Sequence, residues 1–456
     1  FLNNIYTCPF LPPQLIIFVQ NKKMELYEIF LQHPVICTDS RNCPAGSLFF
    51  ALKGDNFNAN AYALSALEKG CAYAVIDEEQ YAVDERFILV DNVLETLQNL
   101  ARHHRQQLGT TIIGITGTNG KTTTKELIAA ILKQKFNTLF TQGNLNNHIG
   151  VPLTLLQLTS EHEIAVVEMG ANHPGEIKQL AEIALPDYGI ITNVGKAHLE
   201  GFGSFEGVMK TKGELYQFIN NNNGKIFLNT GNAFLITMSK KAGFLKPDRI
   251  LSYELGNELK GHVAIGKVLS CNPLLHLKCR NAAGEFEIAT QLIGIYNAEN
   301  VLAAATIGTK LGVSNELIKK GLEEYIPQNN RSQLTVTEHN KIIADAYNAN
   351  PTSMNAAIHN FTQMDVPAKT VILGDMLELG KQSGEEHQKI VDLLKDKGFS
   401  SVYLVGKSFQ ATKNNFNCYA TVNDLIQEIQ KNPLKNNFIL VKGSHGIHLE
   451  KILEYI

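Results

Sequence analysis

The sequence predicts an α/β protein with three domains: a small N-terminal α/β domain, a central domain with a largely parallel sheet, and a smaller doubly wound C-terminal domain. Three observations support this prediction. The chain has 456 residues, enough for roughly three domains of about 150 residues each. Short apolar runs alternate with helical patterns along most of it, as in βαβ units. Gly109, which follows a helical pattern, and Pro327 with the polar "QNNRSQ" mark two breaks in this alternation.

The first predicted domain covers residues 24–108. Its apolar runs "GSLFFAL", "CAYAVID" and "RFILVD" are strand candidates, and residues 60–69 have a helical pattern. The stretch "VLETLQNLARHHRQQLG" is helical in period and ends at Gly109, a residue type that commonly terminates helices. Residues 1–23 precede the first methionine, Met24, and we expect them to be an upstream or disordered extension, with Met24 as the natural start.

The second and third predicted domains cover residues 109–326 and 327–456. In the second, "TIIGITG", "EIAVVEMG", "YGIITNV" and "KIFLNT" are strand candidates separated by helical patterns, which indicates a parallel sheet. Residues 246–290 are more typical of short antiparallel strands. In the third domain, "IIADAYNA", "TVILGD", "SVYLVG" and "FILVKGS" alternate with helices, which predicts a Rossmann-like sheet.

Composition argues against several classes of partner. The formal net charge is −3, so no electrostatic footprint for nucleic acid is present. No apolar run reaches the about 18 residues that a membrane span needs. The seven cysteines include no Cys-x-x-Cys pair, so we expect free thiols in a reducing cytosol rather than a zinc or redox motif.

The stretch "IIGITGTNGKTTTKE" has the order strand, glycine-rich turn, helix. The common phosphate loop has a glycine, four residues and then Gly-Lys-Ser/Thr, but Ile115 stands where the early glycine belongs. Gly117 and Gly120 allow backbone angles barred to other residues, and the helix N-terminus then faces an anion. Lys121 adds a charge for the β- and γ-phosphates, and Thr122 a hydroxyl for Mg²⁺. This order predicts a P-loop ATPase-like domain, rather than an ordinary turn with a chance Gly-Lys-Thr.

Polar residues also follow other predicted strands. Glu168 closes an apolar strand at the edge where α/β sheets present ligand-binding groups, and it could either bind Mg²⁺ or cap a loop. His198 lies beyond the next strand end, and Lys212 follows on a predicted helix. A hard cation prefers oxygen ligands, so Lys212 could bind one only after its amine has reacted, for example with CO₂ to give a carbamate. Without a ligand, His198 and Lys212 would be ordinary surface or core residues.

The third domain carries a similar group of polar residues. Arg331 lies at the hinge, where it would meet a phosphate only if the domains close. The residues at the two strand ends are Asp345, Tyr347, Asn348 and Asn350 in "DAYNANPTSM", and Asp375 and Glu378 in "LGDMLELG".

On these motifs, residues 24–456 resemble the Mur ligases of peptidoglycan synthesis. "GTNGKTTTKE" is similar to that family's phosphate loop, which normally lacks the early glycine, so Ile115 is expected. "TQGNLNNHIGVPLTLL", "VVEMGANHPGEI" and "HLEGFGSFEGVMKTKGE" resemble the members of the family that add D-alanyl-D-alanine, as do "DAYNANPTSM" and "LGDMLELG".

The resemblance implies an activity and its partners. The enzyme would use ATP, two Mg²⁺ ions and a carbamylated lysine to join D-alanyl-D-alanine to UDP-N-acetylmuramoyl-tripeptide through an acyl phosphate. It would be a cytoplasmic monomer that contributes to cell-wall biogenesis, and hence to cell shape and division, with no nucleic-acid partner and no membrane span.

The resemblance also implies residue roles. Catalysis would depend on Lys121, His198 and Lys212. The metal ligands would be Thr122, Glu168, His198 and Lys212 as the carbamate. ATP would be bound by Gly117, Thr118, Asn119, Gly120, Lys121, Thr122, Asn297, Asn300, Arg331, Asp345 and Tyr347. The UDP substrate would be bound by Ser40, Arg41, Lys53, Asn144, Asn146 and Asn147. The acceptor would be bound by Asn348, Asn350, Asp375 and Glu378.

Two segments depart from the family pattern. The family usually has an arginine after "KGS", where this chain has His445. Residues 228–234, "LNTGNAF", lack the usual acidic residue. Roles borrowed from the family are therefore not carried to these positions.

Two alternatives are open. One is another amide ligase of the superfamily, such as the diaminopimelate- or lysine-adding enzyme or folylpolyglutamate synthase. An acceptor with a free α-carboxylate favours an arginine clamp, as in the "DNPR" of the sister enzyme, but here "NANP" is followed by Thr352. The other alternative is a nucleotide-dependent binding or transport ATPase, which would turn over ATP without the peptide substrate.

Overall fold

A computed structural model describes residues 22–328 and 331–456 of the chain. Of the extension predicted for residues 1–23, residues 1–21 lie outside the described part of the chain. The described residues form two compact units, the first up to Gly109 together with His148–Ser160, and the second of Thr110–Asn147 together with Glu161–Ile456. Among the described helices, none has the length and apolar character needed to cross a membrane.

The first unit is built on a four-stranded parallel sheet in the order β1-β2-β5-β6. Its strands are β1 (Ile36–Cys37), β2 (Leu48–Phe50), β5 (Tyr73–Ile76) and β6 (Phe87–Leu89), with a hairpin of β3 (Lys53–Gly54) and β4 (Phe57–Asn58). Its helices are α2 (Lys22–Gln32), α3 (Ala63–Glu68), α4 (Val93–Leu108) and α6 (Gly150–Leu155). The side chain of Asn92 accepts a hydrogen bond from Glu95 N at the start of α4, and Gly109 ends the helix with φ 64°, as predicted.

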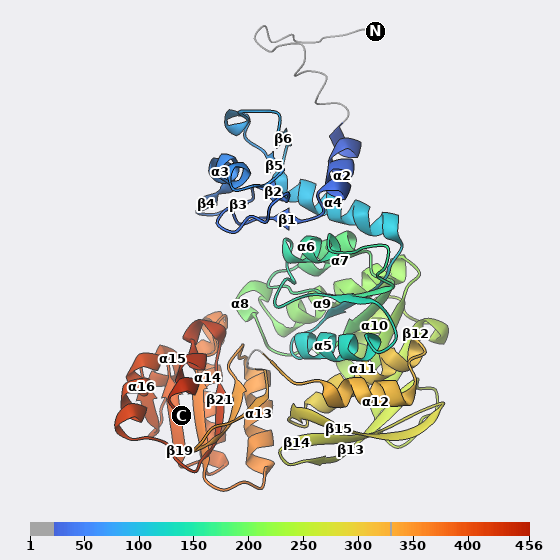
Figure 1. The fold of residues 1–456 in the computed structure, drawn as a ribbon. Helices are drawn as coiled ribbons and strands as arrows, with labels where there is room; N and C mark the ends of the chain where they lie inside the picture. The colour runs from blue at the N-terminus through green and yellow to red at the C-terminus, as the bar shows by residue number, and fades with distance from the viewer. Residues whose placement is uncertain (1–21, 329–330) are drawn as a thin grey trace. The chain divides into compact units, whose positions relative to one another are not determined.

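The second unit contains a nine-stranded sheet in the order β15-β14-β13-β12-β11-β10-β7-β9-β8 (Figure 1). Its strands are β7 (Thr111–Thr116), β8 (Thr138–Phe140), β9 (Ile164–Glu168), β10 (Tyr188–Ile191), β11 (Lys225–Asn229), β12 (Ile250–Leu255), β13 (Ala264–Cys271), β14 (Leu274–Asn281) and β15 (Gly284–Ile293). The strands from β8 to β13 are parallel, and β9 is buried at every position. Because both faces of these strands are buried, their sequences are continuous apolar runs.

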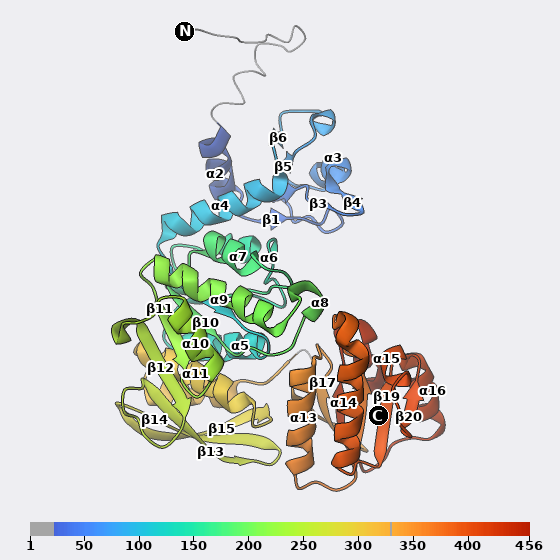
Figure 2. The same ribbon diagram turned by 180° about the vertical axis from the view of Figure 1, so that it is seen from behind.

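Helices cover both faces of this sheet. α5, α11 and α12 pack together on one face, and α9 and α10 lie on the other, as the two opposite views show (Figures 1 and 2). The helices are α5 (Lys121–Leu132), α7 (Glu176–Ala184), α8 (Leu199–Phe202), α9 (Phe205–Asn221), α10 (Ala233–Lys241), α11 (Asn297–Lys310) and α12 (Asn315–Glu324). The prediction of antiparallel strands over residues 246–290 was partly wrong, since β12 is parallel to both of its neighbours and only β13, β14 and β15 form antiparallel pairs.

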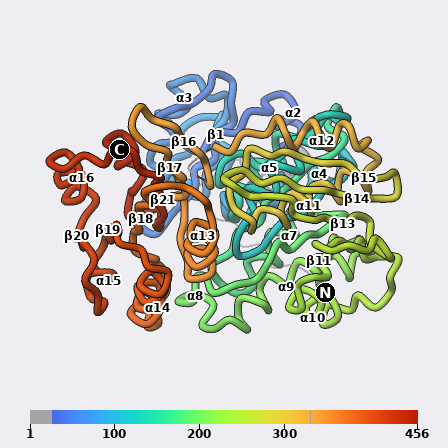
Figure 3. The backbone as a smooth tube through the Cα atoms, turned by 90° about the horizontal axis from the view of Figure 1, so that it is seen from below, coloured from blue at the N-terminus to red at the C-terminus, as the bar shows by residue number. Residues whose placement is uncertain are grey.

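The remaining sheet of the second unit has six strands in the order β16-β17-β21-β18-β19-β20. They are β16 (Gln333–Val336), β17 (Lys341–Asp345), β18 (Lys369–Gly374), β19 (Ser401–Val405), β20 (Asn417–Tyr419) and β21 (Phe438–Lys442). Only β16 is antiparallel to its neighbour. The helices are α13 (Pro351–Gln363), α14 (Ser383–Asp396), α15 (Lys407–Gln410) and α16 (Val422–Lys431), of which α13 and α14 lie side by side (Figures 2 and 3).

The predicted α/β class, with a parallel central sheet and a doubly wound C-terminal sheet, is confirmed. The limits 24–108, 109–326 and 327–456 stay a prediction. Residues 148–160 belong by sequence to the second of these ranges, yet they pack with the first unit.

Candidate active site

The glycine-rich loop joins β7 to α5 and is supported by the end of β10. Gly117 and Gly120 have φ values of 147° and 76°, which residues other than glycine rarely adopt. Asn119 N donates to Asn193 Oδ1 at 3.0 Å, and Thr192 Oγ1 donates to Asn119 O at 2.7 Å. These bonds hold the loop in a conformation that turns the N-terminus of α5 toward the strand ends.

Lys121, the first residue of α5, folds back over the loop. Its Nζ donates to Gly117 O at 2.8 Å and to Thr118 O at 3.1 Å. Burial lowers the pKa of Lys121. Thr122 is buried in the same helical turn. A lysine charge, a hydroxyl and a helix N-terminus therefore meet at one place, as an anion such as phosphate requires.

The fit around Gly117 gives a stability prediction. A Cβ at this position would overlap Thr192 Oγ1, and φ is unfavourable for any other residue. We expect Gly117→Ala to lower the free energy of unfolding by about 2–4 kcal/mol, measured by denaturant unfolding. Gly109→Ala is the control, because Gly109 also has positive φ but nothing lies within 4 Å of a Cβ there. It should cost only about 1 kcal/mol, and equal losses would contradict the steric explanation.

Glu168 ends β9 beside the loop and is 1% exposed. Its Oε1 accepts a hydrogen bond from Asn146 Nδ2 at 2.8 Å. Its Oε2 has no hydrogen-bond partner among the described residues, although Lys125 Nζ lies 3.9 Å away. A buried carboxylate oxygen that lacks a donor fits a hard cation such as Mg²⁺. The alternative role of capping a loop has no support here, because the carboxylate accepts no backbone amide among the described residues.

Lys125 was missed by the sequence analysis. Its side chain is fully buried, and Nζ donates to Thr141 O at 2.6 Å and also faces Glu126 at 3.7 Å. Burial lowers the pKa of Lys125. The available signal was its position: Lys125 lies four residues after Lys121 and three before Ile128, on the buried face of α5.

Lys212 lies in α9 with only 2% of its surface exposed. Its Nζ donates to Ala171 O at 3.3 Å and lies 5.2 Å from the centre of the Phe202 ring. Burial, with the positive charge of Lys121 nearby, lowers the pKa of Lys212 to about 7. Much of this amine is therefore neutral near neutral pH, which is the form that reacts with CO₂.

Glu214 does not pair with Lys212. Its two carboxylate oxygens accept hydrogen bonds at 2.9 Å from Gly175 N and Lys178 N, at the start of α7. The structure therefore offers Lys212 a backbone carbonyl and an aromatic face, and no carboxylate of the described residues forms a salt bridge with it.

His198 and Glu378 lie in close contact. His198 Nδ1 lies 2.5 Å from Glu378 Oε2, and the hydrogen bond from His198 lowers the pKa of Glu378. Both residues have left-handed backbone angles, φ 49° and 63°. Such angles are unfavourable for side-chain-bearing residues and often mark functional positions. A predicted metal ligand and a predicted acceptor residue are thus brought together.

Asn297 and Asn300 face the loop from the first turn of α11. Asn300 Nδ2 donates to Asn297 Oδ1 at 2.8 Å, and Asn297 Nδ2 donates to Ile293 O at 2.8 Å. A Cβ on Gly120 would lie 2.6 Å from Asn300 Oδ1. Asn300 therefore packs against Gly120 of the loop, Asn297 holds Asn300 in place, and the contact of both amides with adenine stays a prediction.

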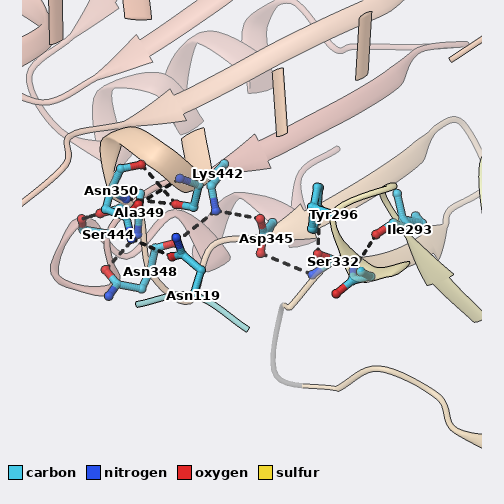
Figure 4. Close-up of polar contacts among 12 residues, drawn as sticks. Asn119, Ile293, Tyr296, Ser332, Asp345, Asn348, Ala349, Asn350, Lys442 and Ser444 are labelled. Atoms are coloured by element: carbon cyan, nitrogen blue, oxygen red, sulfur yellow. Dashed lines mark hydrogen bonds and ion pairs between the residues drawn. The ribbon is translucent and has the colours of Figure 1, made fainter. Parts of the chain in front are cut away.

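The segment after β17 reaches the loop directly. Asn350 Nδ2 donates to Asn119 Oδ1 at 2.7 Å (Figure 4). Lys442 Nζ holds this segment by donating to Asp345 Oδ2 at 2.7 Å and to Asn348 O at 3.2 Å. Lys442 was not predicted as a site residue, and its position inside the apolar run of β21 was the available signal.

Arg331, Tyr347 and His445 form a stack. The Arg331 guanidinium carbon lies 3.5 Å from the centre of the Tyr347 ring. The His445 ring is 5.8 Å from the Tyr347 ring at an interplanar angle of 21°. The histidine at the position where the family usually has arginine therefore contacts the tyrosine that we expected to meet the base.

Asp375 is buried at 4% exposure and serves the local fold. Its carboxylate accepts hydrogen bonds from Ser408 N at 2.8 Å and Phe409 N at 2.9 Å, at the start of α15. Both carboxylate oxygens of Asp375 are used in these bonds, so its geometry does not support the predicted contact with the acceptor.

The residues predicted to bind the UDP substrate lie in both units. In the first unit, Arg41 pairs with Asp39 at 2.8 Å and is 87% exposed. Lys53 pairs with Asp77 at 2.8 Å, and Ser40 O accepts from Lys69 Nζ at 2.7 Å. In the second unit lie Asn144, Asn146 and Asn147, of which Asn146 contacts the candidate metal carboxylate.

Comparison with known proteins identifies the family. Residues 115–308 match the Mur ligase middle domain, and residues 330–445 match the Mur ligase, glutamate ligase domain. The UDP-N-acetylmuramoyl-tripeptide–D-alanyl-D-alanine ligase of Bacillus subtilis (strain 168) is 34% identical in an alignment 445 positions long that covers 94% of each chain. The chain belongs to the Mur ligase family.

Solved structures agree with this assignment. A MurF crystal structure from Acinetobacter baumannii has a TM-score of 0.83 to this Mur ligase at 30% identity, covering 94% of this chain and 97% of that one. The MurF ligase from Thermotoga maritima in complex with ADP has a TM-score of 0.81 at 25% identity, covering 93% and 97%. As a member of this family, the protein is an ATP-dependent amide ligase.

Proposed function

We propose that this Mur ligase joins D-alanyl-D-alanine to UDP-N-acetylmuramoyl-tripeptide in the cytoplasm, as a monomer. The observation that carries the proposal is the hydrogen bond between Asn119 of the phosphate loop and Asn350 of "DAYNANPTSM". It brings the segment with the proposed acceptor residues to the nucleotide loop. The names of relatives such as the Bacillus subtilis enzyme support the choice of substrates.

ATP is the energy source in this proposal. Residues 117–122 hold the phosphates through backbone amides, Lys121 and the helix N-terminus, and ADP in the Thermotoga maritima structure supports a nucleotide there. Asn297, Asn300 and Tyr347 line the base, and Arg331 and Asp345 contact phosphate and ribose. Ser40, Arg41 and Lys53 bind the uridine nucleotide, with Asn144, Asn146 and Asn147 on the sugar-peptide.

Mg²⁺ fits the residues around Glu168. Thr122 and Glu168 would hold one ion, and His198 with a carbamylated Lys212 a second. When bound, Mg²⁺ supplies positive charge to the phosphate oxygens. The carbamate forms when the neutral Lys212 amine attacks CO₂: an N–C bond forms, a proton leaves the nitrogen, and the neutral lysine becomes an anion able to ligate a cation.

The chemistry follows from charge and position. The tripeptide carboxylate takes the γ-phosphoryl group of ATP, which gives an acyl phosphate and ADP. The acceptor amine then attacks the acyl carbon, and phosphate leaves with the electrons of the broken C–O bond. Lys121 stabilises the charge on the transferring group, while Asn348, Asn350 and Glu378 position the acceptor. Asp375 contributes indirectly, because its carboxylate holds the start of α15 beside this strand end.

Acceptor choice provides the test. No arginine follows Asn350, and Thr352 Oγ1 already accepts from Lys196 N at 3.2 Å. We expect ADP release with UDP-N-acetylmuramoyl-tripeptide to be fastest with D-alanyl-D-alanine and at least about tenfold slower with lysine or diaminopimelate, a difference of about 1.4 kcal/mol in the barrier. Equal or faster release with a single amino acid would contradict the proposal. ATP turnover without any peptide substrate would instead favour a binding or transport ATPase.

A further inference from the structure

Three cysteines that are far apart in the sequence meet in the first unit. Cys37 ends β1, Cys43 follows in the next loop, and Cys71 precedes β5. Their Sγ atoms all lie within 4.8 Å of one another, and those of Cys37 and Cys43 are 3.5 Å apart. The sequence spacing predicted free thiols and no zinc motif, and the three thiols are free. Their proximity could not be predicted from spacing, because the parallel sheet brings the ends of separate segments together.

The surroundings of the three thiols favour a soft cation. Cys37 and Cys71 are 5% and 3% exposed, and Cys43 is half-buried. Among the described residues, no carboxylate or imidazole joins the three Sγ atoms. Thiolate-only sets select thiophilic ions such as Zn²⁺ over Mg²⁺ or Ca²⁺. Two thiolates on one tetrahedral Zn²⁺, with Zn–S of about 2.3 Å, lie about 3.8 Å apart, so only small side-chain shifts are needed.

The thiols also hold a short loop that carries predicted substrate residues. Cys37 Sγ donates to Asp39 O at 3.2 Å and to Asn42 O at 3.5 Å, and Cys43 Sγ lies 3.6 Å from Asp39 O. Ser40 and Arg41 lie inside this loop. Any ligand that binds both Cys37 and Cys43 therefore fixes the two ends of the segment that we assign to the uridine nucleotide.

We infer that Cys37, Cys43 and Cys71 form a three-thiolate site for one thiophilic divalent cation, Zn²⁺, whose binding orders the loop of residues 38–42. Cysteine ligates a metal as the thiolate, so binding releases protons and strengthens as the pH rises. Ordering the loop reduces the entropy lost when the nucleotide binds. This second consequence rests on the proposed function, whereas the metal site itself does not.

The test uses the full chain, stripped of metal with a chelator and kept reduced. Titration with Cd²⁺ should give a sulfur-to-metal charge-transfer band that saturates at one ion per chain, and added Zn²⁺ should displace it. Cys43→Ser should weaken Cd²⁺ binding at least about tenfold. Cys418→Ser is the matched control, because Cys418 is similarly half-buried but outside the cluster, and it should leave the titration unchanged.

Several results would overturn the site: absence of the band, a band that Cys43→Ser leaves intact, or failure of Zn²⁺ to displace Cd²⁺. A Cys37–Cys43 disulfide found by mass spectrometry in place of metal binding would also overturn it. For the coupling, one equivalent of Zn²⁺ should lower KM for the UDP substrate severalfold with kcat unchanged, and Cys43→Ser should abolish that effect. An unchanged KM would contradict the coupling. A preference for an acceptor other than D-alanyl-D-alanine would contradict the proposed function. The Cd²⁺ titration depends neither on the acceptor nor on KM, so it tests the metal site separately.

Discussion

Lys121→Ala should lower kcat by about 10³-fold while the protein stays folded. The physical reason is that Lys121 Nζ lies on the loop, held by Gly117 O and Thr118 O, so the substitution removes the charge that we assign to the transferring phosphoryl group. Its two hydrogen bonds to the loop carry little of the total stability, so the thermal midpoint should fall by only a few degrees. The measurement is steady-state ADP release together with thermal unfolding.

Lys133→Ala is the matched control for this variant. Lys133 is exposed just after the other end of α5, and its Nζ lies 4.2 Å from the centre of the Phe140 ring. It should keep turnover within about twofold, because exposed substitutions change little. A folded Lys121→Ala enzyme that ligates at the normal rate would show that the loop does not hold the reacting phosphate.

Lys212→Ala should lower turnover at least about 100-fold. Mutating a residue that only orients a metal ligand typically costs about 10–100-fold in activity, and losing the proposed ligand itself should cost more. Lys212→Met removes the same amine but fills the space, so it separates loss of the ligand from a packing defect. Both variants should be inactive, and acetate or formate added to the assay should partly restore Lys212→Ala but not Lys212→Met. Lys210→Ala, an exposed neighbour on the same helix, should behave as wild type.

The proposed carbamate predicts that turnover depends on pH and on CO₂. The pKa of Lys212 is about 7, so the neutral amine, and with it the carbamate, increases as the pH rises through 7. We expect wild-type turnover to rise over this range and to fall when bicarbonate is removed at constant pH. Near-normal turnover of Lys212→Ala, or activity indifferent to bicarbonate, would refute the carbamate.

Local sequence patterns were sufficient for the phosphate site. Ile112, Ile113 and Ile115 are fully buried in β7, and the glycines and Lys121 follow in the predicted order. These features depend on residues that are close together in the sequence. The spacing of hydrophobic residues and the position of turn-forming residues are sufficient to predict them. Glu168 could be placed at the same sheet edge by the rule that parallel strands end together.

Contacts between distant segments could not be predicted in this way. The pairing of His198 with Glu378 depends on how α8 meets the loop after β18, which no periodicity encodes. The cysteine cluster depends on β1, β2 and β5 lying side by side in the sheet. Lys125 was missed for the same reason, because its burial against Thr141 O and Glu168 follows from the packing of α5 on the sheet.

The position of β21 has a consequence for how the protein is made. This strand lies between β17 and β18, although 63 residues of chain, 375–437, separate it from the end of β18. A ribosome delivers the chain from its N-terminus, so β17 and β18 emerge long before the strand that must separate them. The nascent sheet therefore stays divided until Phe438–Lys442 has left the exit tunnel, and Lys442 reaches Asp345 and Asn348 only then. The acceptor segment is consequently among the last parts of the ligase to mature, and a chain released early would leave it unanchored.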